Sequence, residues 1–404
     1  MSQAHGPLHG IRVIDVTTVM LGPYATQVLG DMGADVIKIE APPAGDIARN
    51  LGAARTPGMS GSYLNMNRNK RSMALDLKHQ AAKDVLRQLV ESADVFMHNM
   101  RPAAIERLGF GYDDVAKMKP GIVYVGAYGF GQSGPYRDKP ALDDAIQAAS
   151  GLASLFQRQD GAPRYVPSAV ADKIVGLTVT QAVLAALVHK ERTGQGQFVE
   201  VPMLESLVSF NLIDHLGAGA YAEPPNKIGY ARAASPSRRP FRTKDGYVCM
   251  LPYDDRQVLS FLKAIGRPEL MAHEHMCSYA ARAKHPESFY DLIHQVSPGK
   301  TTGEWLALCD AAQIPSMPIV DIEDLPDDEH LAAVGMFEPH THPTEGKTRL
   351  VRSPIGFSRS PASIRRPAPR FGEHSIELLR EEGCDEAQIN ALLASGALLG
   401  LKKE

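Results

Sequence analysis

Ile11-Arg-Val-Ile-Asp15, followed by residues 23–30 and by Gly33-Ala-Asp-Val-Ile-Lys-Ile-Glu40, is the stretch that decides the fold. The two apolar runs are typical of buried strands, and the segment between them is typical of a helix that ends before Gly33. A strand, a helix and a second strand in this order form a βαβ unit, whose crossover is right-handed. The chain therefore begins as an α/β protein.

The same alternation continues through the first half of the chain. We expect helices over residues 78–92, 103–108 and 172–192, and strands over residues 94–98, 121–127 and 197–201. Strands that alternate with helices predict a doubly wound parallel sheet. Residues 172–192 have little polar face before His189, so we expect an inner helix there.

A change of composition near residue 218 indicates a domain boundary. From there the chain is rich in Gly, Pro, Arg and Ser, and a second Pro-rich stretch follows at residues 352–371. Between them we expect a small α+β domain, with a strand at 247–251 and helices at 255–264 and 302–312. Two short helices, at 374–382 and 385–395, end the chain.

The composition is that of an ordinary soluble globular protein. The 404 residues are 44% hydrophobic and 22% charged, with a net charge of −3, which makes nucleic acid an unexpected partner. The four cysteines (Cys249, Cys277, Cys309 and Cys384) form no Cys-x-x-Cys pair, which favours reduced thiols in a cytosol. The N-terminus has no secretory pattern and no apolar run reaches about 20 residues, so we expect a cytoplasmic protein that does not span a membrane.

Asp172 is the most informative single residue. It lies at the start of the long apolar helix expected from residue 172, where unpaired backbone N–H groups and the helix dipole favour an ionised carboxylate. Two interpretations are open from this position alone: a nucleophile, or an N-cap, for which Asp is among the preferred residues.

Two other patterns are considered and set aside. Gly129-Phe-Gly131-Gln-Ser-Gly134 matches the dinucleotide pattern, but the Pro-rich residues 135–140 that follow are unsuited to the helix that must hold a pyrophosphate. A Gly-rich loop beside an active site, or a plain turn, fits better. The pairs His273/His275 and His340/His342 lack an evident third ligand, so no metal site is expected. Basic residues near the ends of the predicted strands favour a phosphate-rich ligand.

Read together, these segments resemble the class III CoA-transferase family (CaiB/BaiF family), whose relatives include formyl-CoA transferase and α-methylacyl-CoA racemase. The resemblance covers nearly the whole chain. The motifs that carry it are Pro7-Leu-His-Gly-Ile-Arg-Val-Ile-Asp15, residues 33–40, Asn67-Arg-Asn-Lys-Arg-Ser72, Asn99-Met-Arg-Pro102 with Leu108-Gly-Phe110, Gly131-Gln-Ser-Gly-Pro-Tyr136, Gln147-Ala-Ala-Ser-Gly151, Thr193-Gly-Gln-Gly-Gln197 and Asp245-Gly-Tyr247.

The resemblance implies a transferase that moves CoA from an acyl-CoA to a carboxylic acid, with Asp172 as the residue that carries the acyl group. Covalent aspartyl intermediates are expected, with the N–H groups of the Gly-rich loop stabilising the oxyanions. Coenzyme A enters as a substrate, and no metal or redox cofactor is implied.

The resemblance also implies which residues contact CoA. They are Val19, Met20 and Leu21 in the nucleotide or thiol channel, Leu75 and Lys78 beside the adenine, Asn99, Met100, Arg107 and Leu108 along the pantetheine and phosphates, and Lys139.

Four departures from the family pattern argue against a formyl or oxalate substrate. Ala41 stands where relatives often have Arg, Met20 where formyl-CoA transferase has Gln, and Pro140 about where it has Lys. The glycine run of that enzyme is replaced by residues 232–239. Arg238 and Arg239 in this segment can pair with the second carboxylate of a dicarboxylic acyl group, although an exposed basic loop is an equal alternative.

Two other functions stay open. A racemase of this scaffold uses a His within a Gly-His-Asp segment, whereas this chain has Pro140-Ala-Leu-Asp-Asp144. A silent CoA-binding protein would fit if Asp172 were buried and paired with an Arg.

The resemblance further implies a large Rossmann-like CoA-binding domain (residues 1–220, completed by 330–404), a small domain (221–329) and an interlocked homodimer.

Overall fold

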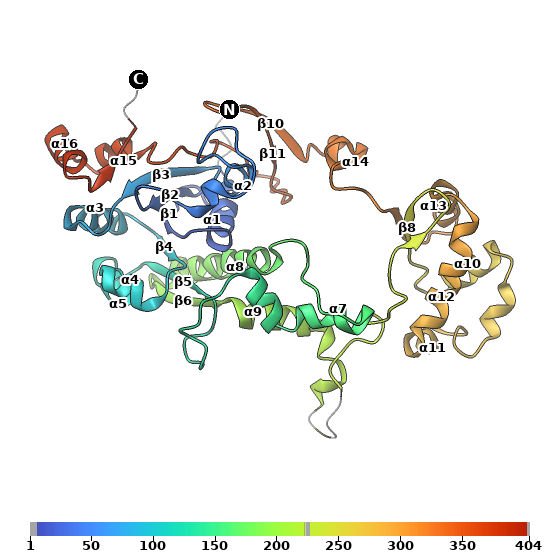
Figure 1. Cartoon of the computed structure of the whole chain (residues 1–404). Helices are drawn as coiled ribbons and strands as arrows, with labels where there is room; N and C mark the ends of the chain where they lie inside the picture. The colour runs from blue at the N-terminus through green and yellow to red at the C-terminus, as the bar shows by residue number, and fades with distance from the viewer. Residues whose placement is uncertain (1–5, 222, 224–226, 402–404) are drawn as a thin grey trace. The chain divides into compact units, whose positions relative to one another are not determined.

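A computed structural model describes residues 6–221, 223 and 227–401 (Figure 1). The chain divides into two compact units. Unit 1 contains the described residues of Met1–Ala149, Pro167–Leu207 and Glu329–Glu404, and unit 2 contains those of Ser150–Val166 and Val208–Asp328. The second unit thus begins before residue 221 and also takes in a short segment from the first half of the chain.

Unit 1 is built on a seven-stranded sheet with the strand order β12-β3-β2-β1-β4-β5-β6. Six strands are parallel, and β12 pairs with β3 in antiparallel orientation. The strands are β1 (Arg12–Val16), β2 (Asp35–Glu40), β3 (Lys70–Leu75), β4 (Val95–His98), β5 (Val123–Tyr128), β6 (Gln197–Pro202) and β12 (Leu398–Leu399). The strand order reverses between β1 and β4, which is where open α/β sheets bind their ligands.

Helices cover this sheet and connect its strands (Figure 1). They are α1 (Leu21–Asp31), α2 (Gly61–Met66), α3 (Gln80–Glu91), α4 (Pro102–Leu108), α5 (Tyr112–Met118), α6 (Asp143–Ala149), α8 (Val170–Thr193), α15 (Ser375–Glu381) and α16 (Glu386–Ala394), with the 3₁₀ turn η1 (Ile47–Asn50). The short helix α14 (Glu329–Ala333) and the antiparallel hairpin β10 (Phe337–His342) and β11 (Gly346–Val351) also belong to unit 1.

The main core of unit 1 joins both ends of the sequence. Strand residues such as Ile14 and Phe96 pack with Leu86 of α3 and with Leu378 of α15, all of them fully buried. Leu398 of β12 is also fully buried, beside β3. The C-terminal segment is therefore part of the sheet domain in space.

Helix α8 is apolar because it packs against both α1 and the sheet. Its buried residues include Ala171, Val175, Val179 and Val183. At Gly176 an added Cβ would lie 2.9 Å from the carbonyl oxygen of Leu21, so only glycine allows this close approach of α1. By length and composition alone α8 could cross a membrane, and 39% of its most apolar 18-residue window is buried in the structure.

Unit 2 has its own core and a three-stranded antiparallel sheet in the order β7-β8-β9. Phe261, Ile293 and Trp305 are its central buried residues. Its elements are α7 (Leu152–Asp160), most of α9 (Met203–His215), η2 (Gly217–Ala220), β7 (Phe241–Arg242), β8 (Tyr247–Met250), α10 (Asp255–Ala264), η3 (Pro268–Ala272), α11 (Tyr279–Lys284), α12 (Pro286–Val296), η4 (Ser297–Gly299), α13 (Thr302–Ala311), β9 (Ser316–Pro318) and η5 (Leu325–Asp327).

The sequence predicted most of the long elements, and their ends differ from the structure by a few residues. It did not predict β3, α2, α5, α6, α7 or α9, and it took the sheet as wholly parallel, whereas β12 is antiparallel. No helix begins in residues 129–142, in agreement with the rejection of a dinucleotide site.

Candidate functional site

The carboxyl ends of β1 and β4 meet at the point where the strand order reverses. Two hydrogen bonds join them: the Thr18 N–H donates to Oδ1 of Asn99 at 3.0 Å, and Nδ2 of Asn99 donates to the Thr18 carbonyl at 2.8 Å. Three predicted contact residues, Val19, Met20 and Asn99, thus come from neighbouring loops at this edge. A ligand at this edge of the sheet would lie beside all three.

Asp172 lies in the first turn of α8, three residues after the N-cap residue, Ala169. The N-cap interpretation of Asp172 is therefore wrong. The Asp172 N–H donates to Oδ2 of Asp143 at 2.9 Å, so α6 and the start of α8 are connected through Asp143. Within the described part of the chain, no residue forms a hydrogen bond or ion pair with the Asp172 carboxylate, which leaves it available for chemistry.

The environment of Asp172 opposes ionisation. Burial, together with the nearby Asp143 carboxylate, raises the pKa of Asp172 to about 7. The sequence predicted that the helix N-terminus would favour the ionised form. Burial and a like charge outweigh that effect, because the macrodipole of a helix contributes only about 0.3–1 kcal/mol at an exposed site.

The Gly-rich loop after β5 is held by two carboxylates. The Gly131 N–H donates to Glu205 at 2.9 Å, and the Gln132 N–H donates to Glu200 at 2.7 Å. An added Cβ at position 131 would lie 2.6 Å from Oε1 of Glu205, so the Glu205 side chain would have to move away. These two N–H groups are already bonded, so the expectation that this loop supplies them to an oxyanion is not met.

A pocket of about 180 Å³ brings several predicted residues together. Asn99, Met100 and Lys139 line it, and so do Arg101 and Arg137. Nζ of Lys139 lies 4.0 Å from the centre of the ring of Tyr136. Three cationic side chains around one pocket suit the phosphates of a nucleotide-like ligand.

The other predicted CoA contacts have different environments. Leu75 is fully buried and Leu21 nearly so, so neither residue offers surface to a ligand in this structure. Leu108 packs against the main core of unit 1. Lys78 and Arg107 are exposed, at the carboxyl side of β3 and in the last turn of α4.

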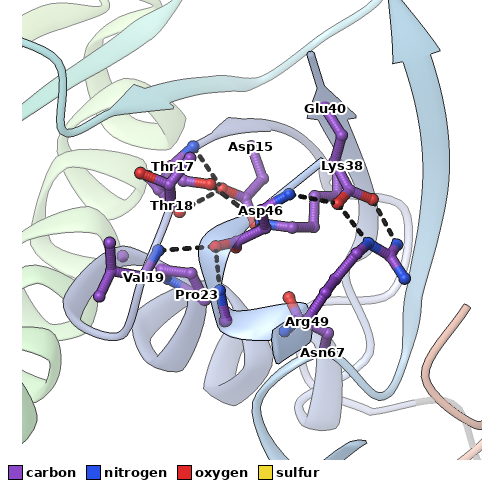
Figure 2. A network of polar contacts seen from close by, with 12 residues as sticks. Asp15, Thr17, Thr18, Val19, Pro23, Lys38, Glu40, Asp46, Arg49 and Asn67 are labelled. Atoms are coloured by element: carbon purple, nitrogen blue, oxygen red, sulfur yellow. Dashed lines mark hydrogen bonds and ion pairs between the residues drawn. The ribbon is translucent and has the colours of Figure 1, made fainter. Parts of the chain in front are cut away.

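A buried charge network lies beneath the loop after β1 (Figure 2). Lys70 Nζ lies 3.1 Å from Oδ2 of Asp15, and Lys38 Nζ lies 2.7 Å from Oδ2 of Asp46. Burial favours the neutral form of Asp15, but Lys70 and Lys38 outweigh it and lower the pKa of Asp15. The pKa of Lys70 falls to about 8 because burial exceeds the effect of Asp15. Buried, paired charged side chains therefore lie directly against the loop after β1.

Sequence reasoning missed Asp143, Asp46 and Lys38 as parts of the site. Asp143 was noted only because its segment lacks a histidine, and its contact with Asp172 spans 29 positions of the chain. In unit 2, Arg238 and Arg239 are exposed in a loop. No cluster of three or more metal-binding side chains occurs among the residues that the structure describes.

Comparison with known proteins places this site in a family. The sequence profile of CoA-transferase family III matches residues 8–375. The chain belongs to CoA-transferase family III. It is 30% identical over 395 residues to the succinyl-CoA:glutarate CoA-transferase of Homo sapiens, covering 97% of this chain and 90% of the relative. It is 35% identical to the succinyl-CoA–L-malate CoA-transferase beta subunit of Chloroflexus aurantiacus, covering 96% of each.

Solved structures agree with this family assignment. A CaiB/BaiF family protein from Brucella suis superposes with a TM-score of 0.79 at 26% identity, over 94% of this chain and all of that one. A hypothetical protein from Mycobacterium tuberculosis gives 0.79 at 29% identity, over 93% and 100%. As a family III CoA-transferase the protein is a transferase, and the substrates of such enzymes are CoA thioesters.

Proposed function

We propose that the protein transfers CoA between two dicarboxylic acids through covalent intermediates on Asp172. The observation that carries this proposal is the Asp172 carboxylate itself, which is partly buried, has no polar partner among the described residues and has a pKa raised to about 7. A carboxylate with these properties is a better nucleophile than one held in an ion pair. A silent CoA-binding protein, in contrast, was expected to pair Asp172 with an Arg.

The proposed first half-reaction forms an aspartyl thioester. An Asp172 oxygen attacks the thioester carbon of the acyl-CoA, and the C–S bond breaks to release CoA thiolate and leave a mixed anhydride. The thiolate then attacks the carbonyl carbon of Asp172, and the first carboxylic acid leaves as its carboxylate. The acceptor carboxylate reverses these steps, so the thiolate departs on the new acyl group and Asp172 is regenerated.

Two sets of residues are assigned to CoA binding within this proposal. Asn99, Met100, Lys139, Arg101 and Arg137 surround the CoA phosphates, in keeping with the pocket that they line. Val19 and Met20, with Lys78, Arg107 and Leu108, complete the CoA site. The succinyl, glutarate and malate in the names of the two relatives support a dicarboxylic acyl group.

The alternative activity, racemisation of an acyl-CoA, needs a histidine base in addition to an aspartate. At the end of β4, His98 is fully buried, Nε2 lies 2.9 Å from the hydroxyl of Tyr124, and burial lowers the pKa of His98 to about 4. This histidine is therefore closed to a substrate proton. The transferase is better supported.

We also propose a cytoplasmic homodimer. All four cysteines are free thiols, as suits a reducing compartment. Helix α8 exposes Leu177 and Val188, at 49% and 50%, and α9 exposes Phe210 and Ile213, at 57% and 87%. These side chains provide apolar surface that a second chain can cover. Sedimentation at two protein concentrations should give the mass of two chains, and a monomer would contradict the proposal.

Mass spectrometry tests the covalent mechanism. The protein is incubated with succinyl-CoA or glutaryl-CoA and then with hydroxylamine, which converts an aspartyl thioester to a hydroxamate. We expect the hydroxamate on Asp172 in the wild type, and neither adduct nor transfer in Asp172→Ala. The matched control Asp144→Ala, an exposed neighbour of Asp143, should keep both. Exchange of the α-proton in deuterated water without any adduct would establish the racemase instead.

A further inference from the structure

Val19, between β1 and α1, adopts a backbone conformation that its side chain disfavours. Its φ of 72° lies in the left-handed region. Among the described residues the other non-glycine residues with positive φ are Asn69 and Gln313, neither of which is branched at Cβ. A β-branched residue in this region is a true outlier, and it persists only where its surroundings enforce it.

The residues around Val19 form hydrogen bonds with the backbone groups of residues 17–19. The Thr17 N–H donates to Asp15 at 2.9 Å, and Lys38 Nζ donates to the Thr17 carbonyl at 2.9 Å. The Asn99 side chain forms hydrogen bonds with both backbone polar groups of Thr18, its N–H and its carbonyl. The Val19 N–H then donates to Oδ1 of Asp46 at 2.9 Å, as Figure 2 shows.

Asp46 is the group that fixes Val19, and it is itself held from three sides. It is 1% exposed, and Lys38 forms an ion pair with its other oxygen at 2.7 Å. Its own N–H donates to Oε1 of Glu40 at 3.0 Å, and Glu40 is paired with Arg49. Oδ1 also accepts from the Ala48 N–H, so Asp46 is the N-cap of η1. A buried carboxylate held in this way has little freedom to move.

The position of Val19 matters because α1 starts beside the helix that carries Asp172. Gly176 lies one helical turn after Asp172, and its missing side chain admits the Leu21 carbonyl. A change at Val19 would therefore move residues that lie next to the first turns of α8. The strained loop and Asp172 are parts of one structural arrangement within unit 1.

We infer that Asp46 is a positioning residue for the transfer reaction: it holds Val19 in the left-handed conformation and so fixes the loop after β1 beside the acyl-CoA. This inference rests on the proposed function for the identity of the reaction. Preorganisation of this kind acts mainly on kcat, since a misplaced contact lowers the rate of the chemical step more than it lowers binding.

A double-mutant cycle tests the inference. Asp46→Ala removes the acceptor, and we expect kcat to fall about tenfold or more with KM changed less than about threefold, in keeping with the usual cost of backbone strain. Val19→Gly removes the strain, because glycine adopts positive φ freely. In the Val19→Gly background, Asp46→Ala should therefore lower kcat by no more than about threefold. Equal losses in both backgrounds would overturn the inference.

Asp46→Asn separates the hydrogen bond from the ion pair and serves if Asp46→Ala does not fold. Its amide oxygen still accepts from Val19, so kcat should stay within about threefold of wild type. A folded Asp46→Asn enzyme with a tenfold loss of kcat would show that the pair with Lys38 matters instead, which contradicts the inference. The double-mutant cycle measures overall CoA transfer and does not depend on a covalent adduct. If no hydroxamate forms on Asp172, the proposed intermediate is refuted, and the inference about Asp46 is still tested by the cycle.

Discussion

At the scale of single residues, the property that suits Asp172 to chemistry also works against folding. Its pKa is about 7 in the folded protein, against an ordinary value of 3.8. Between pH 4 and 7 the unfolded chain loses this proton while the folded chain keeps it, so the free energy of unfolding falls as pH rises through that range. Above pH 7 Asp172 is ionised in both states, and the free energy of unfolding falls no further on its account.

Asp172→Asn should therefore stabilise the protein while abolishing transfer. We expect the free energy of unfolding to rise by about 1–3 kcal/mol at pH 8 and to change little at about pH 3, where Asp172 is mainly protonated in both the folded and the unfolded chain. Urea unfolding at the two pH values measures this. Asp144→Asn is the control, with a change of less than about 0.5 kcal/mol at either pH. A variant that is less stable than wild type at pH 8 would contradict the burial argument.

Asp143 should set the pH at which the enzyme becomes active. We expect kcat to fall below about pH 7, because in the proposed mechanism only the ionised form of Asp172 attacks the thioester. Asp143→Asn removes the like charge and keeps an acceptor for the Asp172 N–H, so the midpoint of the pH–kcat profile should move to lower pH. Burial remains, so the midpoint should stay above 3.8. An unchanged midpoint would show that Asp143 acts only as a structural acceptor.

At the scale of elements, β3 shows what the sequence could not predict. All six of its residues are buried although it begins with Lys70-Arg71. Two charges within six residues hide the apolar pattern that identifies a buried strand. Only the fold supplies their partners, Asp15 and Asp35, from strands that lie far away in the sequence. The strands β1, β2, β4, β5 and β6 carry a clear apolar pattern, and all five were predicted.

The candidate site divides in the same way. Asp172, Asn99 and Lys139 were predicted, because their local motifs carry the resemblance to the family. Asp143 and Asp46 were missed, since nothing near them in the sequence distinguishes them from other surface acids. Their roles come from contacts with Asp172 and Val19, 29 and 27 positions away.

Breaking the buried ion pair between Asp15 of β1 and Lys70 of β3 should lower the free energy of unfolding. Lys70→Met leaves Asp15 without its nearest cation, and we expect a loss of about 3–5 kcal/mol in urea unfolding. The double variant Lys70→Met/Asp15→Asn leaves no unpaired carboxylate there, so its loss should be smaller than that of Lys70→Met alone. Lys78→Met, an exposed control, should change stability by less than about 0.5 kcal/mol. A double variant as unstable as the sum of both single variants would refute the coupling.

The close contact between α1 and α8 should tolerate no side chain at Gly176. Gly176→Ala would place a carbon 2.9 Å from the Leu21 carbonyl, and we expect a loss of about 1–3 kcal/mol together with slower transfer. Gly303→Ala is the matched control in another helix, because nothing lies within 4 Å of its added carbon. That variant should be as stable as wild type or up to about 1 kcal/mol more stable. Equal effects of the two variants in thermal unfolding would contradict this packing argument.

At the scale of the whole molecule, the chain leaves unit 1 and returns to it. The segment from Glu329 brings α15, α16 and β12 back to the sheet, so the edge strand β3 is covered by residues more than 300 positions away. Such long-range closure costs conformational entropy, and the buried C-terminal side chains must offset it. An uncovered β3 would present a sheet edge open to aggregation.

The two units should unfold separately, each according to its own core. Trp305 is the one tryptophan of the chain and lies buried in unit 2, so its fluorescence reports on that unit, while circular dichroism reports on both. Leu398→Ala should lower the midpoint temperature of the main transition seen by circular dichroism, with a loss of about 2–5 kcal/mol in the free energy of unfolding. The midpoint of the transition seen by Trp305 fluorescence should stay unchanged. Phe261→Ala should do the reverse, whereas Leu399→Ala, at a side chain 40% exposed, should change neither by much. If both core variants shift one common transition, the units unfold as a single cooperative body, and β12 stabilises the whole molecule rather than unit 1 alone.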